Sequence, residues 1–148
     1  MKITICGSIA FMEEMLRVKA ELEKLGHEVD LPLTEIKNNQ GDYIPVSEYY
    51  EIRKSANPEP WVWDVKREAM LDHFAKIEWA DVILVLNIEK NGVVGYVGAN
   101  TLIEMGLALF LKKPIYLSNQ IPDMNCREEI MGMKPKVLDG DLSRIKLA

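Results

Sequence analysis

The chain has 148 residues, a length typical of one domain with a full core, and we treat residues 1–148 as a single domain. Its composition, 48% hydrophobic and 28% charged, is typical of a globular protein, and no apolar run approaches the roughly 18 residues that a membrane span needs. The net charge of -5, without any Lys/Arg cluster, argues against nucleic acid as a partner, so we expect neither a nucleic acid nor a membrane partner.

The first seven residues indicate a strand leading into a turn, and Glu13 and Glu14 arrive too early for the apolar stretch of a signal peptide. We therefore expect a cytoplasmic protein. The two cysteines, Cys6 and Cys126, lie far apart in the chain, which favours neither a disulfide framework nor a zinc site. We expect both to be small buried hydrophobic side chains.

Hydrophobic periodicity predicts alternating strands and helices along most of the chain. The expected strands are 2–6, 27–31, 82–86, 115–117 and 136–138. The expected helices are 12–25, 64–79 with Asp64 as its cap residue, 100–111 and 125–131.

Strand–helix–strand units of this kind predict parallel pairing through right-handed crossovers. The continuous apolar run 82–86 is typical of a central parallel strand with helices on both faces. We therefore predict an α/β fold, with one doubly wound, flavodoxin-like or Rossmann-like parallel sheet of about five strands. Ligands of such folds bind beyond the carboxyl ends of the strands.

Residues 34–63 interrupt this rhythm as an insertion in which we expect one helix, at about 46–56. Aromatic residues gather between positions 43 and 63, namely Tyr43, Tyr49, Tyr50, Trp61 and Trp63. They are suited to stacking on a planar base, and Trp61 and Trp63 are candidate substrate-binding residues. The alternatives are a dimer interface or a small packed satellite of the core.

A glycine-rich loop follows the predicted central strand, with glycines at positions 92, 95 and 98 just before a helix. Backbone N–H groups exposed by such glycines, together with a helix N-terminus, can hold an anion, so Gly95, Gly98 and Asn100 are candidate binding residues. The pattern matches neither the dinucleotide fingerprint nor the P-loop. The glycines are equally consistent with tight turns alone.

Glu104 follows in what we expect to be the first turn of that helix. The helix dipole would lower the pKa of a carboxyl group there, which suits a nucleophile. The segment from Thr101 to Glu104 also matches a capping box, in which the glutamate would only bond the N–H of the cap residue. Both interpretations are open from the residues alone.

Several short motifs together resemble the nucleoside 2-deoxyribosyltransferase family and the related 2-deoxynucleoside 5-monophosphate N-hydrolases, over most of residues 2–118 outside the insertion. The motifs are Ile5-Cys6-Gly7-Ser8-Ile9, Ala80-Asp81-Val82, Glu104-Met105-Gly106-Leu107-Ala108 and Lys113-Pro114-Ile115. The resemblance implies that Glu104 is the nucleophile on the anomeric carbon, and that Cys6, Gly7, Ser8 and Ile9 lie by the sugar and phosphate. It also implies a homo-oligomer, a dimer or tetramer, and neither a metal nor a redox cofactor.

The chain departs from the family pattern at two positions. The family usually carries an aspartate where this chain has His73, preceded by Asp72, and often an Asp or Ser where it has Gly98. Asp72 and His73 are therefore the candidates for the acid–base catalyst that protonates the departing base. His73 is suited to this role because imidazole titrates near neutral pH. A packed histidine without a catalytic role is the alternative for His73, and Ser8 is equally suited to capping the helix after it.

The leading hypothesis is cleavage or transfer of the N-glycosidic bond of a nucleoside or nucleoside monophosphate, with Glu104, Asp72 and His73 as the catalytic candidates. The alternatives are a non-catalytic nucleotide-binding or sensing module and a hydrolase of another ribosyl donor.

Overall fold

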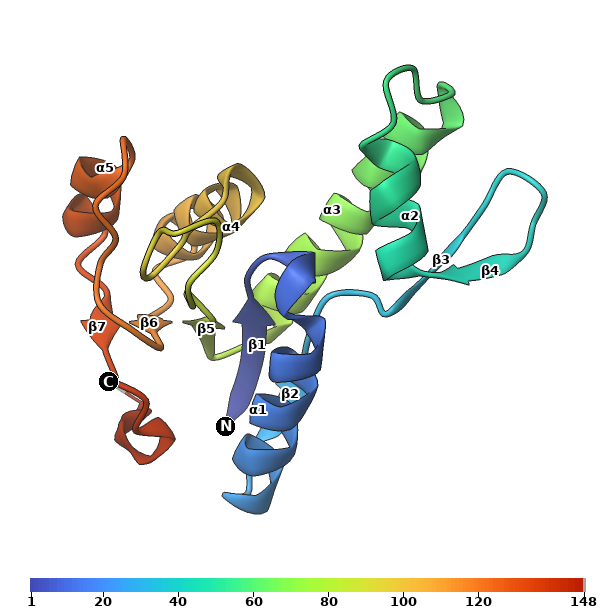
Figure 1. The fold of residues 1–148 in the computed structure, drawn as a ribbon. Helices are drawn as coiled ribbons and strands as arrows, with labels where there is room; N and C mark the ends of the chain where they lie inside the picture. The colour runs from blue at the N-terminus through green and yellow to red at the C-terminus, as the bar shows by residue number, and fades with distance from the viewer. Residues whose placement is uncertain (148) are drawn as a thin grey trace.

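The computed structural model describes residues 1–147, and the last residue of the expected domain, Ala148, lies outside them. Its centre is a five-stranded sheet in the order β2-β1-β5-β6-β7, with every neighbouring pair parallel (Figure 1). The strands are β1 (Lys2–Cys6), β2 (Glu28–Asp30), β5 (Val82–Val85), β6 (Ile115–Leu117) and β7 (Lys136–Val137). The predicted α/β fold and strand number are confirmed, and β5 is the middle strand, as its apolar run indicated.

Helices cover both faces of the sheet, so the predicted doubly wound arrangement is also confirmed. Side chains of β1 point alternately to the two faces of the sheet. Ile3 packs on one face with α1 (Met12–Lys24), and Cys6 packs on the opposite face in a hydrophobic cluster with three further helices. Those are α3 (Trp61–Trp79), α4 (Ala99–Phe110) and α5 (Arg127–Gly132). The chain also contains two short 3-10 helices, η1 (Ile9–Phe11) and η2 (Leu142–Arg144). Within residues 1–147, no helix is both long and apolar enough to span a membrane.

Helix α3 begins three residues earlier than the sequence predicts. Pro60 occupies its cap position with φ -54°, and no side chain caps the helix. Proline is pre-organised for the start of a helix because its ring holds φ near -65°. The prediction that Asp64 is the cap is therefore wrong, and Asp64 lies in the first turn, where the helix dipole favours a carboxylate.

The insertion contains a hairpin that the sequence analysis missed, formed by β3 (Glu35–Lys37) and β4 (Tyr43–Pro45). It leads into α2 (Val46–Arg53), the helix expected there, and Figure 1 shows the hairpin and α2 beside the first half of α3, away from the sheet. Asn38 stabilises the hairpin turn, since its side-chain oxygen accepts hydrogen bonds from the backbone N–H groups of Gln40 and Asp42 at 3.0 and 2.9 Å.

The insertion has a small core of its own, formed by Ile36, Val46, Tyr49 and Val62. The buried Tyr49 hydroxyl donates to the carbonyl oxygen of Val62 at 2.8 Å, which ties α2 to the start of α3. Part of the aromatic segment is therefore a packed satellite of the main core.

A buried asparagine joins the loops that follow β5 and β6. Asn87 Nδ2 donates to the carbonyl oxygens of Asn119 and Gln120 at 3.1 and 3.0 Å, and Oδ1 accepts from the Asn119 N–H at 2.9 Å. Gly95 packs against this junction with φ +73°, and a Cβ atom there would lie 2.5 Å from the Gln120 carbonyl oxygen. Gly95 therefore serves the turn, as the second interpretation of the glycine loop proposed.

Replacing Gly95 by alanine should destabilise the protein far more than replacing Gly92. Both glycines have positive φ, but a Cβ atom on Gly92 would meet nothing within 4 Å. We expect Gly92→Ala to lower the free energy of unfolding by about 1–2 kcal/mol through backbone strain alone, and Gly95→Ala by about 3 kcal/mol or more. Urea unfolding measures both, and equal losses would contradict the assigned packing of Gly95.

Candidate active site

Three buried side chains from different elements converge beyond the carboxyl end of β1. They are Cys6 at the end of β1, His73 on α3 and Glu104 on α4, and one donor atom from each lies within 4.8 Å of the others. His73 and Glu104 are each only 3% exposed. The predicted nucleophile therefore lies inside the protein, in contact with the first predicted loop.

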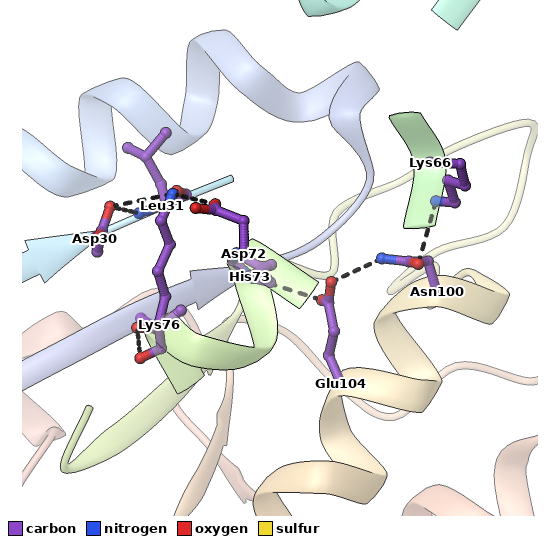
Figure 2. A network of polar contacts seen from close by, with 9 residues as sticks. Asp30, Leu31, Lys66, Asp72, His73, Lys76, Asn100 and Glu104 are labelled. Atoms are coloured by element: carbon purple, nitrogen blue, oxygen red, sulfur yellow. Dashed lines mark hydrogen bonds and ion pairs between the residues drawn. The ribbon is translucent and has the colours of Figure 1, made fainter. Parts of the chain in front are cut away.

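Asn100 and Lys66 hold one oxygen of the Glu104 carboxyl group. Asn100 Nδ2 donates to Glu104 Oε1 at 2.7 Å, and Lys66 Nζ donates to Asn100 Oδ1 at 3.2 Å (Figure 2). The other oxygen, Oε2, lies 3.8 Å from Nε2 of His73 and has no hydrogen-bond partner among the described residues. One oxygen is thus fixed and the other is free for chemistry.

The capping-box interpretation of Glu104 is wrong. Gly98, not Thr101, is the cap residue of α4, so the helix begins at Ala99 and Glu104 lies in its second turn. Its carboxyl group bonds the side chain of Asn100 rather than the backbone of Thr101.

The prediction of a lowered pKa for Glu104 is also wrong. Burial raises the pKa of the Glu104 carboxyl to about 8, against the opposing effects of the Cys6 thiol, Lys66 and Asn100. The helix dipole acts mainly on groups in the first turn, whereas removal from water disfavours the charged form wherever the group is buried. At neutral pH the carboxyl group of the free protein is therefore mainly protonated.

His73 does not titrate near neutral pH. Burial lowers its pKa to about 4, with a further lowering from Lys76 that outweighs the raising effect of Asp72. The imidazole is therefore neutral under physiological conditions, and it is a weak source of protons for a departing base.

Asp72 lies on the other side of α3 from Glu104. Its carboxylate pairs with Lys76 Nζ at 2.8 Å, and Figure 2 shows both side chains turned toward Asp30, away from the Glu104 carboxyl group. Adjacent helix residues diverge by about 100°, so Asp72 and His73 cannot share one face. The structure brings His73, and not Asp72, to the predicted nucleophile.

A cleft of about 410 Å³ opens beside this cluster, and a narrower hollow that shares several of its lining residues reaches Glu104 and His73. Of the predicted binding residues, those that line the cleft, the hollow or both are Gly7, Ser8, Ile9, Trp63, Gly98 and Asn100. Gly98 precedes the amino terminus of α4, and anion binding at this end of the glycine loop stays a prediction.

Three predicted binding residues lie outside the cleft lining. Cys6 is buried beside Glu104, and Gly95 belongs to the turn after β5. Trp61 packs against the ring of Tyr49 with centroids 6.4 Å apart. Tyr50 and Trp63 do line the cleft. The aromatic segment therefore divides between satellite core and cleft wall.

Three cationic residues that the sequence analysis did not single out also line the cleft, namely Arg53, Lys66 and Lys90. Lys90 Nζ donates to the Ser8 hydroxyl at 2.8 Å and lies over the ring of Tyr96, 5.2 Å from its centroid. Burial and, after it, the Arg53 charge lower the pKa of Lys66, so Arg53 and Lys66 repel one another. They lie far apart in the sequence and come together only in the fold, so no sequence motif indicated that they share a cleft.

The chain is similar in structure to three solved proteins. A 2-deoxyribosyltransferase from Bacillus psychrosaccharolyticus is 19% identical with a TM-score of 0.49, covering 79% of this chain and 71% of the other. A CMP N-glycosidase from Clostridium botulinum is 17% identical with a TM-score of 0.45, covering 93% and 85%. A conserved protein from Enterococcus faecalis V583 is 15% identical with a TM-score of 0.45, covering 90% and 74%.

No protein-family model matches the sequence, and no curated protein matches it.

Replacing Glu104 by glutamine should make the protein more stable than the wild type as pH rises. The pKa is about 8 in the folded protein and 4.5 as a reference for the unfolded chain. Stability from the neutral carboxyl group is thus fully present below pH 4.5 and is lost as pH rises through 8. Between pH 5 and 8 we expect the wild type to lose on the order of a few kcal/mol relative to Glu104→Gln. Urea unfolding across this range measures it, and parallel curves for the two proteins would contradict the raised pKa.

Proposed function

We propose that this protein is an enzyme that cleaves or transfers the N-glycosidic bond of a nucleoside monophosphate, with Glu104 as the nucleophile. The observation that carries the proposal is the buried Glu104 carboxyl group, which lines the narrow hollow beside the cleft with one oxygen held by Asn100 and the other without a hydrogen-bond partner among the described residues. The sequence motifs around Glu104 and Cys6 to Ile9 resemble those of enzymes with this chemistry, which supports the same role.

In the proposed reaction, Glu104 Oε2 attacks the anomeric carbon of the sugar. A bond forms between this oxygen and the carbon as the N-glycosidic bond breaks, and its electron pair leaves with the base, which takes up a proton. Water, or the nitrogen of a second base, then attacks the same carbon and releases Glu104. The two displacements follow the logic of retaining glycosidases.

The Glu104 proton must leave before the attack. Because burial raises the pKa of this carboxyl to about 8, only a minor fraction is ionised in the free protein at neutral pH. Neutral His73, 3.8 Å from Oε2, is an acceptor that can orient the carboxyl group as it loses this proton. Asn100 donates to the other oxygen and favours the ionised form.

A phosphate on the substrate suits the charge of the cleft. Arg53, Lys66 and Lys90 line it together, although the whole chain carries a net charge of -5. Like charges gathered in one cleft repel one another, and an anion that binds among them relieves this repulsion. The nearby amino terminus of α4 adds N–H donors for an anion, and Tyr50, Trp63 and Tyr96 offer rings for the base.

A nucleotide-sensing module is the second candidate. The neutral forms of Glu104 and His73 at physiological pH favour it, because binding a nucleotide needs no ionised nucleophile. Turnover separates it from the enzyme.

A homo-oligomer stays a prediction. The side chains of Ile103 and Phe110, two turns apart on one face of α4, are 50% and 81% exposed, which gives this helix an apolar surface suited to a second copy of the chain.

Replacing Glu104 by glutamine should abolish base release. Incubation of the protein with a panel of nucleosides and nucleoside monophosphates, followed by chromatography of the released base, gives the activity. We expect Glu104→Gln to lose about a thousandfold or more, as removal of a covalent nucleophile does. Wild-type kcat/KM should rise with pH toward 8, because the free enzyme must ionise Glu104.

The matched control is Glu68→Gln, whose side chain is 71% exposed on α3 and which should keep full activity. A folded Glu104→Gln protein that releases base at the wild-type rate would end the nucleophile assignment, and absence of turnover by the wild type on every substrate of the panel would favour the sensor.

Replacing Lys90 by methionine should raise KM for nucleoside monophosphates but not for nucleosides. Loss of one charge-assisted contact to phosphate corresponds to about a 10- to 100-fold rise in KM, with little change for the unphosphorylated nucleoside. Lys24→Met, on the exposed end of α1 outside the cleft, is the control and should change neither value. Equal effects of Lys90→Met on nucleoside and monophosphate would place the phosphate elsewhere.

A further inference from the structure

The cluster of Cys6, His73 and Glu104 offers three different donor atoms to one point in space. A sulfur, an imidazole nitrogen and a carboxyl oxygen lie within 4.8 Å of one another, and all three residues are buried. Each comes from a separate element, β1, α3 or α4, so the sheet and its two helices hold the donors in place.

Two members of the cluster are buried without the hydrogen bonds they need. Neither ring nitrogen of His73 and not Oε2 of Glu104 has a hydrogen-bond partner among residues 1–147. Leaving such groups unpaired costs about 1–3 kcal/mol each, so native proteins pair nearly all of them. Asn100 already satisfies Oε1 of Glu104, and the free oxygen is the one that faces His73. His73 Nε2 and Glu104 Oε2, both unpaired, lie 3.8 Å apart, which is consistent with a ligand shared between them.

The donor set suits zinc among the common biological cations. Zn²⁺ takes thiolate, imidazole and carboxylate ligands together, whereas Mg²⁺ and Ca²⁺ prefer oxygen alone. Bond lengths of 2.0–2.3 Å and tetrahedral angles place zinc donors about 3.3–3.8 Å apart. His73 Nε2 and Glu104 Oε2 are already 3.8 Å apart, and a pair at the 4.8 Å limit of the cluster would need to approach by about 1–1.5 Å. The adjoining hollow leaves room for water at a fourth position.

We propose that Cys6, His73 and Glu104 bind one Zn²⁺ ion, and that zinc and the nucleoside compete for Glu104. Binding displaces the thiol proton of Cys6 and the carboxyl proton of Glu104 to solvent, while neutral His73 binds without a proton change. Zinc on Oε2 occupies the oxygen that would attack the sugar. The inhibition by zinc rests on the proposed function, but the binding itself does not.

The test uses the whole purified chain with Zn²⁺ or Co²⁺ alone. Equilibrium dialysis with metal analysis should find one zinc per chain, and Co²⁺ should give the absorption band of a cobalt–thiolate bond. Cys6→Ser should remove that band, and His73→Gln should weaken zinc binding at least tenfold. The chain contains only two cysteines and two histidines, so Cys126→Ser and His27→Gln are matched controls that should bind as the wild type does.

The proposal is overturned if the wild type binds no zinc at micromolar concentration, or if the cobalt–thiolate band survives in Cys6→Ser and disappears in Cys126→Ser. Circular dichroism checks each fold, and His73→Gln keeps the test decisive if Cys6→Ser fails to fold. The two proposals fail separately. Zinc that binds at these residues without slowing base release would overturn the role of Glu104 as nucleophile, and base release by a protein that binds no zinc would overturn only the metal site.

Discussion

The parallel pairing of β1 with β5 is the constraint on which the candidate site depends. From β1 the chain runs through α1 to β2 on one side of the sheet, and from β5 it runs through α4 to β6 on the other. Connections that diverge from two neighbouring strands leave a crevice beyond their carboxyl ends. Cys6 ends β1, and the loop after β5 leads into the helix that carries Glu104. Their meeting is therefore a consequence of strand order.

Removal from water, rather than the helix dipole, decides the electrostatics of the crevice. Burial raises the pKa of Glu104 and lowers that of His73, so both side chains favour their neutral forms in the free protein. A buried group of this kind gains most from a partner that stabilises its charged form. The Glu104 carboxyl group is both the proposed nucleophile and a proposed zinc ligand. The nucleoside and zinc would therefore exclude one another, because both would need the same oxygen.

The insertion supplies the cleft with charge as well as shape. Its satellite core fixes α2 against the start of α3, which brings Arg53 of one helix beside Lys66 of the other. Lys90 joins them from the loop after β5. An acidic protein thereby presents a local cationic surface, and net charge is no guide to the ligand of such a cleft.

The sequence by itself determined the order of the five sheet strands and of the helices between them, the parallel sheet and the central position of β5. These follow from hydrophobic periodicity, which depends only on residues close together in the sequence. It missed the β3–β4 hairpin, whose strands of three residues carry little periodic signal. Only the tertiary structure decided that His73 rather than Asp72 faces Glu104, that the half-buried Trp61 packs against the satellite core while Trp63 lines the cleft, and that the Glu104 pKa rises. The reason is physical, since burial and the direction of a side chain depend on atoms from distant segments, which no local pattern records.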